Sequence, residues 1–467
     1  MLYSDKVLFS ELIKENRWDA GYIYNFSLPI RKLKNDPEFV LKKLDDKDIS
    51  SVISDGEHSQ LPRQKELGIR YLYGRNLKDG IINFDPIADD SYVDEKTYKD
   101  NERIHLQDGD ILVEIVGTIG KAALYRINSY VGIAGIPRHI ARIHTTEKLL
   151  PGYLLGILLS KFGKTQMGIS GTGNIQPLLS LTNLKKIVIP VPKNFGVQKT
   201  ISEKFEIMVH LETKALAQIN LAKDLFIQAL GIDLKKIEKA NFYKVHFRNL
   251  DDSWTPKFYY PLYQNTLKEI KRKFETIKLC DIPADISRGD EVGSENYRGY
   301  LEKINTDVPF VRTSDFVNYE IDSYPDFYIS ENIYNELNQD VRHGDILFTN
   351  DGKIGLCAIF TENDECIIQS HIRRIRIKEK LSPYYVFTFL TTDFALYQVY
   401  RYVVVQSTIS TISNHLSEIE IPILPRDKQE EISQLTKDGF KLKNERKALV
   451  KQANNMVENI VRAKLRY

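Results

Sequence analysis

The sequence predicts a mixed α/β protein built from two tandem repeated globules, each followed by a long helix. Three observations carry this prediction: a long internal repeat, short β-rich runs within each copy, and a polar stretch with helical periodicity at the end of each copy. The 467 residues suffice for two to four domains, since one domain typically has roughly 100–200 residues. Hydrophobic residues make up 42% of the chain, enough to form buried cores.

The internal repeat has a period near half the chain, because landmarks recur in the same order at nearly constant shifts. For example, Gly344 follows Gly109 by 344 − 109 = 235 residues, and His371 follows His139 by 371 − 139 = 232 residues. The recurring pairs are Gly109–Leu112 and Gly344–Leu347, Gly117–Gly120 and Gly352–Gly355, Arg138–Ile140 and Ser370–Ile372, Leu181–Pro190 and Ser413–Pro422, and Trp18 and Trp254.

Short β-rich runs separated by Gly, Asn and Asp turns predict strands in each copy. These runs are Asp110–Ile115, Lys121–Arg126, Ile140–Ile143, Ile187–Val191, Ile346–Thr349, Leu356–Phe360 and Ile372–Ile377. Each copy also carries one helix-like stretch near its centre, Tyr153–Lys164 and Tyr384–Tyr400. Each copy is therefore expected to form a globule of about 170–190 residues with its own core.

Both copies end in a proline pair followed by a long amphipathic helix of about 35–40 residues, which is about 50–60 Å of helix. Because each helix carries an apolar stripe, the two helices are expected to pack on each other as an antiparallel coiled coil. The predicted packing residues are Ile201, Phe205, Met208, Ile219, Phe226, Ile432, Leu435, Leu442, Leu449, Met456 and Ile460. The predicted divisions of the chain are residues 1–192, 193–245, 246–425 and 426–467.

Composition excludes several classes of protein. With 65 Lys and Arg against 63 Asp and Glu, the chain is not a strongly cationic coat for nucleic acid, although local basic faces remain possible. No apolar run reaches the ~18 residues that a membrane span needs, and no secretion signal begins the chain. Three cysteines without a C-x-x-C pair argue against a disulfide scaffold and a zinc site. We therefore expect a cytoplasmic protein that contacts no membrane and binds no metal.

Catalytic motifs are absent from the sequence. The loop Gly117–Lys121 resembles a phosphate-binding loop, but it lacks the earlier glycine and the hydroxyl residue after the lysine. Its glycines are better explained by a tight turn between two strands, and a nucleotide hydrolase at this loop is a minor alternative. The chain has no Pro-Pro dipeptide for an adenine methyltransferase loop and no metal-binding histidine spacing. No catalytic residue is predicted.

Basic residues cluster at equivalent places in the two copies and suit contacts with nucleic acid. One cluster is Arg138, His139 and Arg142, and the other is His371, Arg373, Arg374 and Arg376. The planar guanidinium group matches guanine edges and phosphates. The alternative is that the arginines lie on a solvated strand face paired with acids such as Glu379, and that each histidine is a packed turn residue. The polar loops 171–176 and 406–410 could also bond to bases or phosphates.

Taken together, these motifs resemble the specificity subunit of Type I restriction-modification systems. The carriers are the paired Gly-Asp-Ile-Leu segments, the glycine turns that follow them, and the repeated passage from strand through Ile-x-Ile-Pro into a helix. Arg17-Trp18-Asp19 and Ser253-Trp254-Thr255 resemble the openings of the family's two target-recognition domains. In this sequence Lys353 replaces the usual small residue of the glycine turn.

The resemblance implies a chain that is not itself an enzyme and that reads a bipartite double-stranded DNA target. Its partners would be two methyltransferase subunits and a motor-nuclease, which would hold S-adenosylmethionine, ATP and Mg²⁺, with no cofactor in this chain. The alternatives are the specificity subunit of a Type II-like modification system and a coiled-coil scaffold that binds no DNA. The predicted DNA contacts are Lys121, Arg138, His139, Arg142 and Asn174 in the first copy, and Asn350, Lys353, His371, Arg373, Arg374 and Gln406 in the second.

Overall fold

The computed structural model describes residues 23–63, 68–78, 80–84, 91–171, 177–240, 242–250, 253–299, 302–304, 306–406 and 408–462. The chain divides into two compact units, and each is described by itself. Unit 1 comprises residues within 1–84, 89–211 and 446–467, and unit 2 comprises residues within 85–88 and 212–445. These limits differ from the predicted divisions, because each unit takes part of both long helices.

Unit 1 is built around a four-stranded antiparallel sheet with the strand order β2-β10-β7-β8. A smaller sheet has the order β6-β3-β9, and the pairs β1-β11 and β4-β5 complete the unit. Its strands are β1 (Phe39–Lys43), β2 (Ser50–Asp55), β3 (Ile69–Tyr71), β4 (Leu77–Lys78), β5 (Ile81–Ile82), β6 (Ser91–Val93), β7 (Ile111–Glu114), β8 (Ala122–Leu124), β9 (Ala134–Gly135), β10 (Ile140–Thr145) and β11 (Val188–Pro192). Its helices are α3 (Leu28–Asn35), α4 (Glu95–Asp100), α5 (Pro151–Leu159), α6 (Lys161–Ser170), α7 (Leu181–Leu184) and the first part of α8 (Phe195–Leu230).

Unit 2 has a central sheet of the same kind, with the order β13-β22-β19-β20. Beside it lie the sheet β14-β18-β15-β21 and the pairs β12-β25, β16-β17 and β23-β24. Its strands are β12 (Thr276–Lys278), β13 (Ala284–Arg288), β14 (Arg298–Gly299), β15 (Val308–Val311), β16 (Phe316–Val317), β17 (Glu320–Ile321), β18 (Phe327–Ile329), β19 (Ile346–Thr349), β20 (Cys357–Ile359), β21 (Ile367–Ile368), β22 (Ile372–Ile377), β23 (Val404–Gln406), β24 (Ile409–Thr411) and β25 (Glu420–Pro422). Its helices are α9 (Pro261–Lys273), α10 (Glu331–Leu337), α11 (Pro383–Leu390), α12 (Asp393–Arg401) and the first part of α13 (Arg426–Val461).

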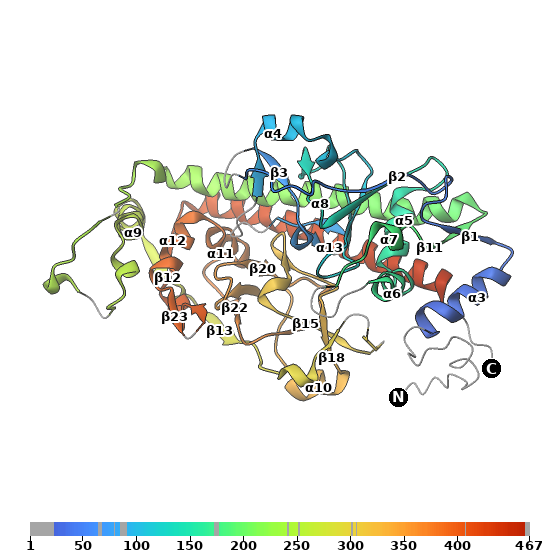
Figure 1. Cartoon of the computed structure of the whole chain (residues 1–467). Coiled ribbons are helices and arrows are strands. Elements are labelled where there is room, and N and C mark those ends of the chain that lie inside the picture. Colours follow the sequence, from blue (N-terminus) through green and yellow to red (C-terminus); the bar gives the residue numbers. More distant parts are fainter. Residues whose placement is uncertain are drawn as a thin grey trace. The chain divides into compact units, whose positions relative to one another are not determined.

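The two units share one topology, which confirms the repeat predicted from the sequence. Strands β2, β10, β7 and β8 correspond in order and direction to β13, β22, β19 and β20. Each unit also contains one parallel strand pair, β3 with β9 and β15 with β21. Helix α11 packs against β20 in unit 2 (Figure 1), and the corresponding helix α5 packs against the corresponding strand β8 in unit 1.

Repeated side-chain bonds tie the helices of each unit to its last strand. The hydroxyl of Tyr153 donates to the carbonyl of Pro190 (2.5 Å), and Tyr385 bonds Pro422 in the same way (2.8 Å). A glutamine on the next helix, Gln166 or Gln398, both accepts from and donates to the backbone of that strand. These bonds satisfy backbone groups that burial would otherwise leave unpaired. They explain why this part of the sequence recurs at a constant shift.

The Gly-Asp-Ile-Leu motif forms the entry to the third strand of each central sheet. Gly109 and Gly344 both have φ of +89°, a conformation that favours glycine. The following aspartate is buried, and its carboxylate accepts from the backbone N–H three residues earlier, which closes the turn (2.8 Å in both units). The same carboxylates bond a cationic or ionisable side chain on the neighbouring strand, His144 in unit 1 and Arg376 in unit 2.

The helix predicted near the centre of each copy is two helices instead of one. Helix α5 ends before Ser160, whose hydroxyl accepts from the N–H of Gly163 and caps α6. Thr392 caps α12 by accepting from Ala395 in the same way. Serine and threonine are strong helix-start residues because they satisfy an unpaired N–H of the first turn. Both breaks therefore have a sequence signal that the apolar pattern concealed.

Helices α8 and α13 are each 36 residues long, as the sequence predicts. In α8 every predicted packing residue is buried: Ile201, Phe205, Met208, Ile219 and Phe226. In α13 only Ile432 of the predicted set is fully buried, and Leu435, Leu442, Leu449, Met456 and Ile460 are half-buried. The buried positions of α13 instead include Thr436, Phe440, Lys443, Arg446, Val450, Ala453, Val457 and Val461. The buried stripe differs from the apolar pattern because charged side chains occupy its centre.

Each unit has its own apolar core. In unit 2 the core joins α11, α12 and the central sheet to the buried residues of α8 and α13 that belong to this unit, among them Phe226 and Ile432. In unit 1 one apolar cluster lies between the central sheet and the strands β4, β5 and β9. Among the described residues, none of the helices is long and apolar enough to cross a membrane.

Candidate nucleic-acid interface

The same end of the central sheet is built alike in both units, and most of the predicted contact residues lie near it. The turn after the third strand uses glycines with positive φ, Gly117 and Gly120 in unit 1 and Gly352 and Gly355 in unit 2. The N–H of the first glycine donates to the loop that follows the helix pair, to Pro177 O (3.0 Å) or Ser410 O (2.8 Å). The glycine turn of unit 2 is therefore bonded to the predicted polar loop 406–410, and the glycine turn of unit 1 is bonded to Pro177, which directly follows the predicted polar loop 171–176.

Asn350 organises this end of unit 2. Its side chain is 0% exposed, and its amide group donates to Ser413 O (3.1 Å) and Asp351 Oδ1 (3.0 Å). Its backbone N–H donates to His371 O (2.9 Å). Asn350 thus holds the loop around Ser413 against the sheet, a positioning role instead of the predicted DNA contact.

His371 and Asp351 form the second layer of this network. The Nδ1 atom of His371 lies 3.0 Å from Asp351 Oδ2. Burial raises the pKa of Asp351, but hydrogen bonds from Thr411, His371 and Asn350 outweigh burial and hold the pKa below its ordinary value. His371 is therefore a hydrogen-bonded turn residue that keeps part of its surface exposed.

Two arginines converge at the start of β22. Arg288 on β13 stands directly opposite Arg373 on β22 in the strand register. Both guanidinium groups donate to one carbonyl, Ser370 O, at 3.0 Å from Arg288 Nε and 3.1 Å from Arg373 Nη1. Burial lowers the pKa of Arg373, and the positive charge of Arg288 lowers it further, while Asp351 opposes both effects. Two cations held side by side form a favourable site for a phosphate or a guanine edge.

The two arginines border a groove of about 380 Å³ in unit 2. Its lining residues are Ile286, Ser287, Arg288, Arg373, Ser413, Asn414, Leu416 and Ser417. Ser413 adopts a left-handed backbone (φ +50°), which is rare for a residue with a side chain and needs support from its surroundings. Asn350 supplies that support through Ser413 O. The groove thus combines two cations with hydroxyl and amide groups, the donor set that DNA phosphates and base edges require.

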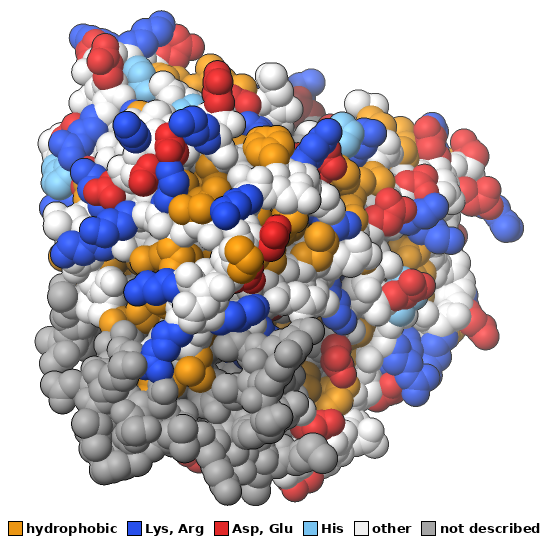
Figure 2. Space-filling view, turned by 90° about the vertical axis from the view of Figure 1, so that its right-hand side faces the viewer, with side chains coloured by type: hydrophobic (Ala, Val, Ile, Leu, Met, Phe, Trp, Pro, Cys, Tyr) orange, Lys and Arg blue, Asp and Glu red, His pale blue; other side chains and the backbone are white. Residues whose placement is uncertain are grey.

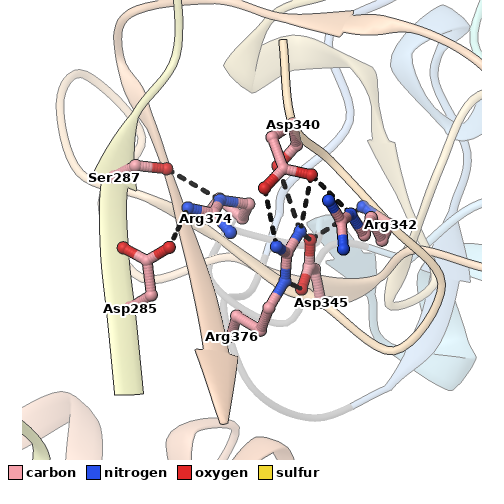
Figure 3. Close-up of polar contacts among 7 residues, drawn as sticks. All are labelled: Asp285, Ser287, Asp340, Arg342, Asp345, Arg374 and Arg376. Carbon is pink, nitrogen blue, oxygen red and sulfur yellow. Dashed lines mark hydrogen bonds and ion pairs between the residues drawn. The ribbon is translucent and has the colours of Figure 1, made fainter. Parts of the chain in front are cut away.

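Arg374 and Arg376 are paired with acids, as Figure 3 shows. Arg374 is 4% exposed and donates to Ser287 Oγ and Asp285 Oδ2, both at 2.7 Å. Arg376 is bonded by Asp345 and Asp340. The alternative interpretation, in which these arginines pair with acids, is therefore correct for Arg374 and Arg376, although the acids are other residues than Glu379. Arg374 supports the sheet from a buried position instead of presenting its guanidinium to DNA.

Unit 1 repeats this supporting arrangement. Arg142 corresponds to Arg374, and its Nε donates to Ser54 Oγ (3.0 Å) while its Nη1 donates to His105 O (2.5 Å). Arg142 is thus also tied to the sheet. The predicted contact Lys121 is half-buried, and its carbonyl accepts from the N–H of Glu114 (2.8 Å) at the base of the glycine turn.

The accessible basic residues of unit 1 lie near His139 or near Tyr73. Arg138 is exposed and His139 is half-buried. Burial lowers the pKa of His139, and the charges of Arg138 and Arg63 lower it further, so the imidazole is neutral near pH 7. Arg63 and Arg75 both lie near the ring of Tyr73, with their guanidinium carbons 5.4 Å and 5.5 Å from its centroid. Cations beside an aromatic ring are a frequent feature of nucleic-acid surfaces.

Two predicted contacts, Asn174 and the side chain of Gln406, lie outside the described residues, although the backbone of Gln406 pairs with Ile409. Lys353 is exposed on the glycine turn of unit 2. Sequence reasoning missed Arg63, Arg75 and Arg288. For Arg288 the sequence offers one signal, because this residue lies on a polar-rich strand, β13. That strand pairs with β22 and places Arg288 beside Arg373, but the two residues are 85 apart in the sequence and their pairing is visible only in the sheet.

The charge of the surface is mixed. On the face in Figure 2, Lys and Arg side chains lie among Asp and Glu side chains over the coloured area. Within the described part of the chain, no group of three or more His, Cys, Asp and Glu side chains is arranged to hold a metal ion. Because acidic side chains lie among the basic ones on the face in Figure 2, the basic character of the candidate interface is local.

The fold and this basic groove define a duplicated α/β protein with a surface suited to nucleic acid. Residues 271–452 match the family model described as the Type I restriction modification DNA specificity domain. This match confirms the resemblance found in the sequence. The match covers unit 2 from the end of α9 and continues into α13.

Similar solved structures include an S subunit of a Type I restriction-modification system from M. genitalium, at 12% identity and a TM-score of 0.40, covering 92% of this chain and 98% of that chain. An HsdS subunit from Thermoanaerobacter tengcongensis has 14% identity and a TM-score of 0.28, with 92% and 98% covered. The type IIG restriction endonuclease BpuSI has 10% identity and a TM-score of 0.29, with 44% and 33% covered. No curated protein matches the chain.

Proposed function

We propose that the chain is the sequence-specific DNA-recognition subunit of a Type I restriction-modification complex. The observation that carries this proposal is the specificity-domain match over residues 271–452, combined with a second copy of the same topology in unit 1. Two copies with different exposed residues suit two different half-sites. In unit 2, Arg288, Arg373 and Lys353 would meet DNA, and in unit 1, Arg138 with Arg63 and Arg75 would do so.

The long helices would set the distance between the two half-sites. A helix of 36 residues is about 54 Å long at 1.5 Å per residue. Two recognition units joined through such helices would read two short sequences separated by bases that neither contacts, as the geometry of dimeric DNA-binding proteins sets half-site spacing.

The helix arrangement gives a direct test of this spacing role. Leu211 of α8 and Glu445 of α13 are the residues after which the chain passes from one unit to the other. Matched insertions of four residues after both positions add about 6 Å of helix, close to two base pairs of DNA. We expect the unread spacer to lengthen while both half-sites stay the same. An unchanged spacer in a map of methylated sites would refute the spacing role.

The chain itself would be non-catalytic. Methyl transfer would come from two methyltransferase subunits that carry S-adenosylmethionine, and cleavage from a motor-nuclease that uses ATP and Mg²⁺. A cytoplasmic location would follow from that assembly. The near-neutral formal charge of +2 predicts weak non-specific DNA binding by the chain alone, because that binding comes mainly from phosphate contacts.

DNA recognition is tested by selecting bound duplexes from a random library with the chain in complex with its modification partner. We expect enrichment of one bipartite sequence. The variant R288A/R373A should lose enrichment at one half-site, whereas R426A, which removes an exposed arginine of α13 paired with Glu430, should not. A flat selection with the parent complex would favour a scaffold that binds no DNA.

A further inference from the structure

The two long helices are equivalent position by position. Both contain 36 residues, and their first residues are separated by 426 − 195 = 231. Glu212 and Lys443 are separated by the same shift, 443 − 212 = 231, so each is the eighteenth residue of its helix. The same repeat position therefore carries a negative charge in one copy and a positive charge in the other.

These two midpoint residues meet in the interior of unit 2. The Nζ atom of Lys443 lies 2.7 Å from Glu212 Oε1, and both side chains are 0% exposed. Asn318 Nδ2 donates to the same carboxylate oxygen (3.0 Å), and Glu320 Oε1 lies 3.8 Å from Lys443 Nζ. Asn318 and Glu320 come from the hairpin β16-β17, whose turn residues Asn318 and Tyr319 have positive φ. The ion pair is thus enclosed by groups that hold its geometry.

The register of the helices is self-complementary. Glu212 faces Lys443, and Gly439 lies against Ala215 and Ile219, so the residue numbers that meet add up to about 655 in unit 2. In unit 1, Lys204 Nζ donates to Gln452 Oε1 (3.1 Å), which gives nearly the same total. When positions are counted from the first residue of each helix, position n of one helix therefore faces about position 36 − n of the other. Two copies of the same helix could pair in this register, as in an interface with two-fold symmetry.

We propose that the buried Glu212–Lys443 pair selects the helix partner: it favours α8 with α13 and rejects the pairing of either helix with its own counterpart from a second copy of the chain. Pairing α8 with α8 would bury two glutamates against each other, and pairing α13 with α13 would bury two lysines. Like charges without water or counter-charge are strongly unfavourable in a dry interior. Single buried polar residues choose partners in coiled coils by the same means. This inference does not depend on DNA recognition.

Charge-reversed full-length chains test the proposal. E212K places Lys at both midpoints of one chain, and K443E places Glu at both. Each variant alone has like charges in every possible pairing, so its midpoint of thermal unfolding should fall by about 10 °C. When the two variants carry different tags and refold together, every pairing between the chains joins opposite charges. Capture on one tag should then retain the other chain, in a particle of twice the 54.0 kDa mass of one chain.

Two further samples keep the test decisive if a single variant does not fold. The double variant E212K/K443E restores opposite charges within one chain, and the Asn318 amide can present its oxygen to the new lysine. It should recover only part of the loss in unfolding midpoint, because Glu320, which lies 3.8 Å from Lys443, then faces a second carboxylate at position 443. The matched control R426E, at an exposed helix position, should neither lower the midpoint nor promote co-capture. The proposal is overturned if the mixed variants do not co-purify, if single variants keep the parental midpoint, or if the double variant recovers nothing.

Discussion

Replacing Asp345 by alanine tests the role assigned to the repeated Gly-Asp-Ile-Leu motif. Its carboxylate is buried and accepts from the backbone N–H of Arg342 at 2.8 Å. It also accepts from Arg376 through Nε and Nη2, both at 2.8 Å, a bidentate arrangement. Arg376 bonds a second acid, Asp340, whose side chain is 48% exposed. Substitutions of Asp345 and of Asp340 are therefore matched perturbations, because both acids bond Arg376 and they differ in burial (Figure 3).

The expected magnitude follows from what each substitution leaves behind. Breaking a buried ion pair costs about 3–5 kcal/mol when the remaining charge has no other partner. After D345A, Arg376 keeps Asp340, so we expect about 2–4 kcal/mol, including the lost acceptor of the turn N–H. D340A removes an exposed partner and should cost much less, because water and salt screen an exposed ion pair. The two arginines Arg376 and Arg342 hold the pKa of Asp340 at about 2, so the exposed pair persists through mildly acidic pH.

The assay is urea unfolding at neutral pH, followed by circular dichroism and by tyrosine fluorescence, because a chain of two units need not unfold in one step. D345A should lower the midpoint of the transition assigned to unit 2 far more than D340A does. Equal effects of the two variants, or a D345A protein with the parental midpoint, would show that the motif does not stabilise the sheet entry.

Three further predictions concern single residues. R138A should raise the pKa of His139 towards 6.5 in an NMR titration, because one of the charges that lowers this pKa is gone, and an unchanged pKa would contradict the prediction. Burial also keeps the pKa of His139 low in the folded chain. The stability contributed by neutral His139 is therefore present above its unfolded pKa and is lost as the pH falls. G439A should destabilise unit 2 by about 1–3 kcal/mol in thermal unfolding, since its new Cβ would lie 2.7 Å from Ile219 Cγ1, and a neutral effect would mean that the helices separate freely. R373A should weaken DNA binding by about 1–3 kcal/mol if it contacts a base, or reduce the salt slope by about 1 if it contacts a phosphate, and binding with both quantities unchanged would remove it from the interface.

The sequence was sufficient for the repeat, for several strands of the two central sheets and for both long helices, because these depend on local patterns. Strands β19 and β22 begin and end where the apolar alternation predicts. The breaks at Ser160 and Thr392 were missed because the apolar stripe continues through them, and only the capping hydroxyls mark the new helix starts. The stripe of α13 was misplaced for the opposite reason, since Lys443 is buried by partners distant in sequence.

The candidate site was harder to predict than the fold. Arginines on one strand look alike in sequence, yet Arg374 meets an aspartate 89 residues away while Arg373 faces Arg288 across the sheet. Which guanidinium is neutralised depends on strand register, and register is set by the packing of the whole unit. Asn350 was likewise chosen for its chemistry, but burial turns its amide toward Ser413.

The most direct measurement is a genome-wide map of methylated adenines in cells that contain the partner subunits with the parent chain, with the R288A/R373A variant, or with no copy of the chain. We expect a two-part motif with a fixed unread gap that vanishes without the chain. For the variant, we expect a loss of sequence preference in one part of the motif only. A single uninterrupted motif, or an identical map in all three strains, would contradict the proposed recognition of a two-part DNA target.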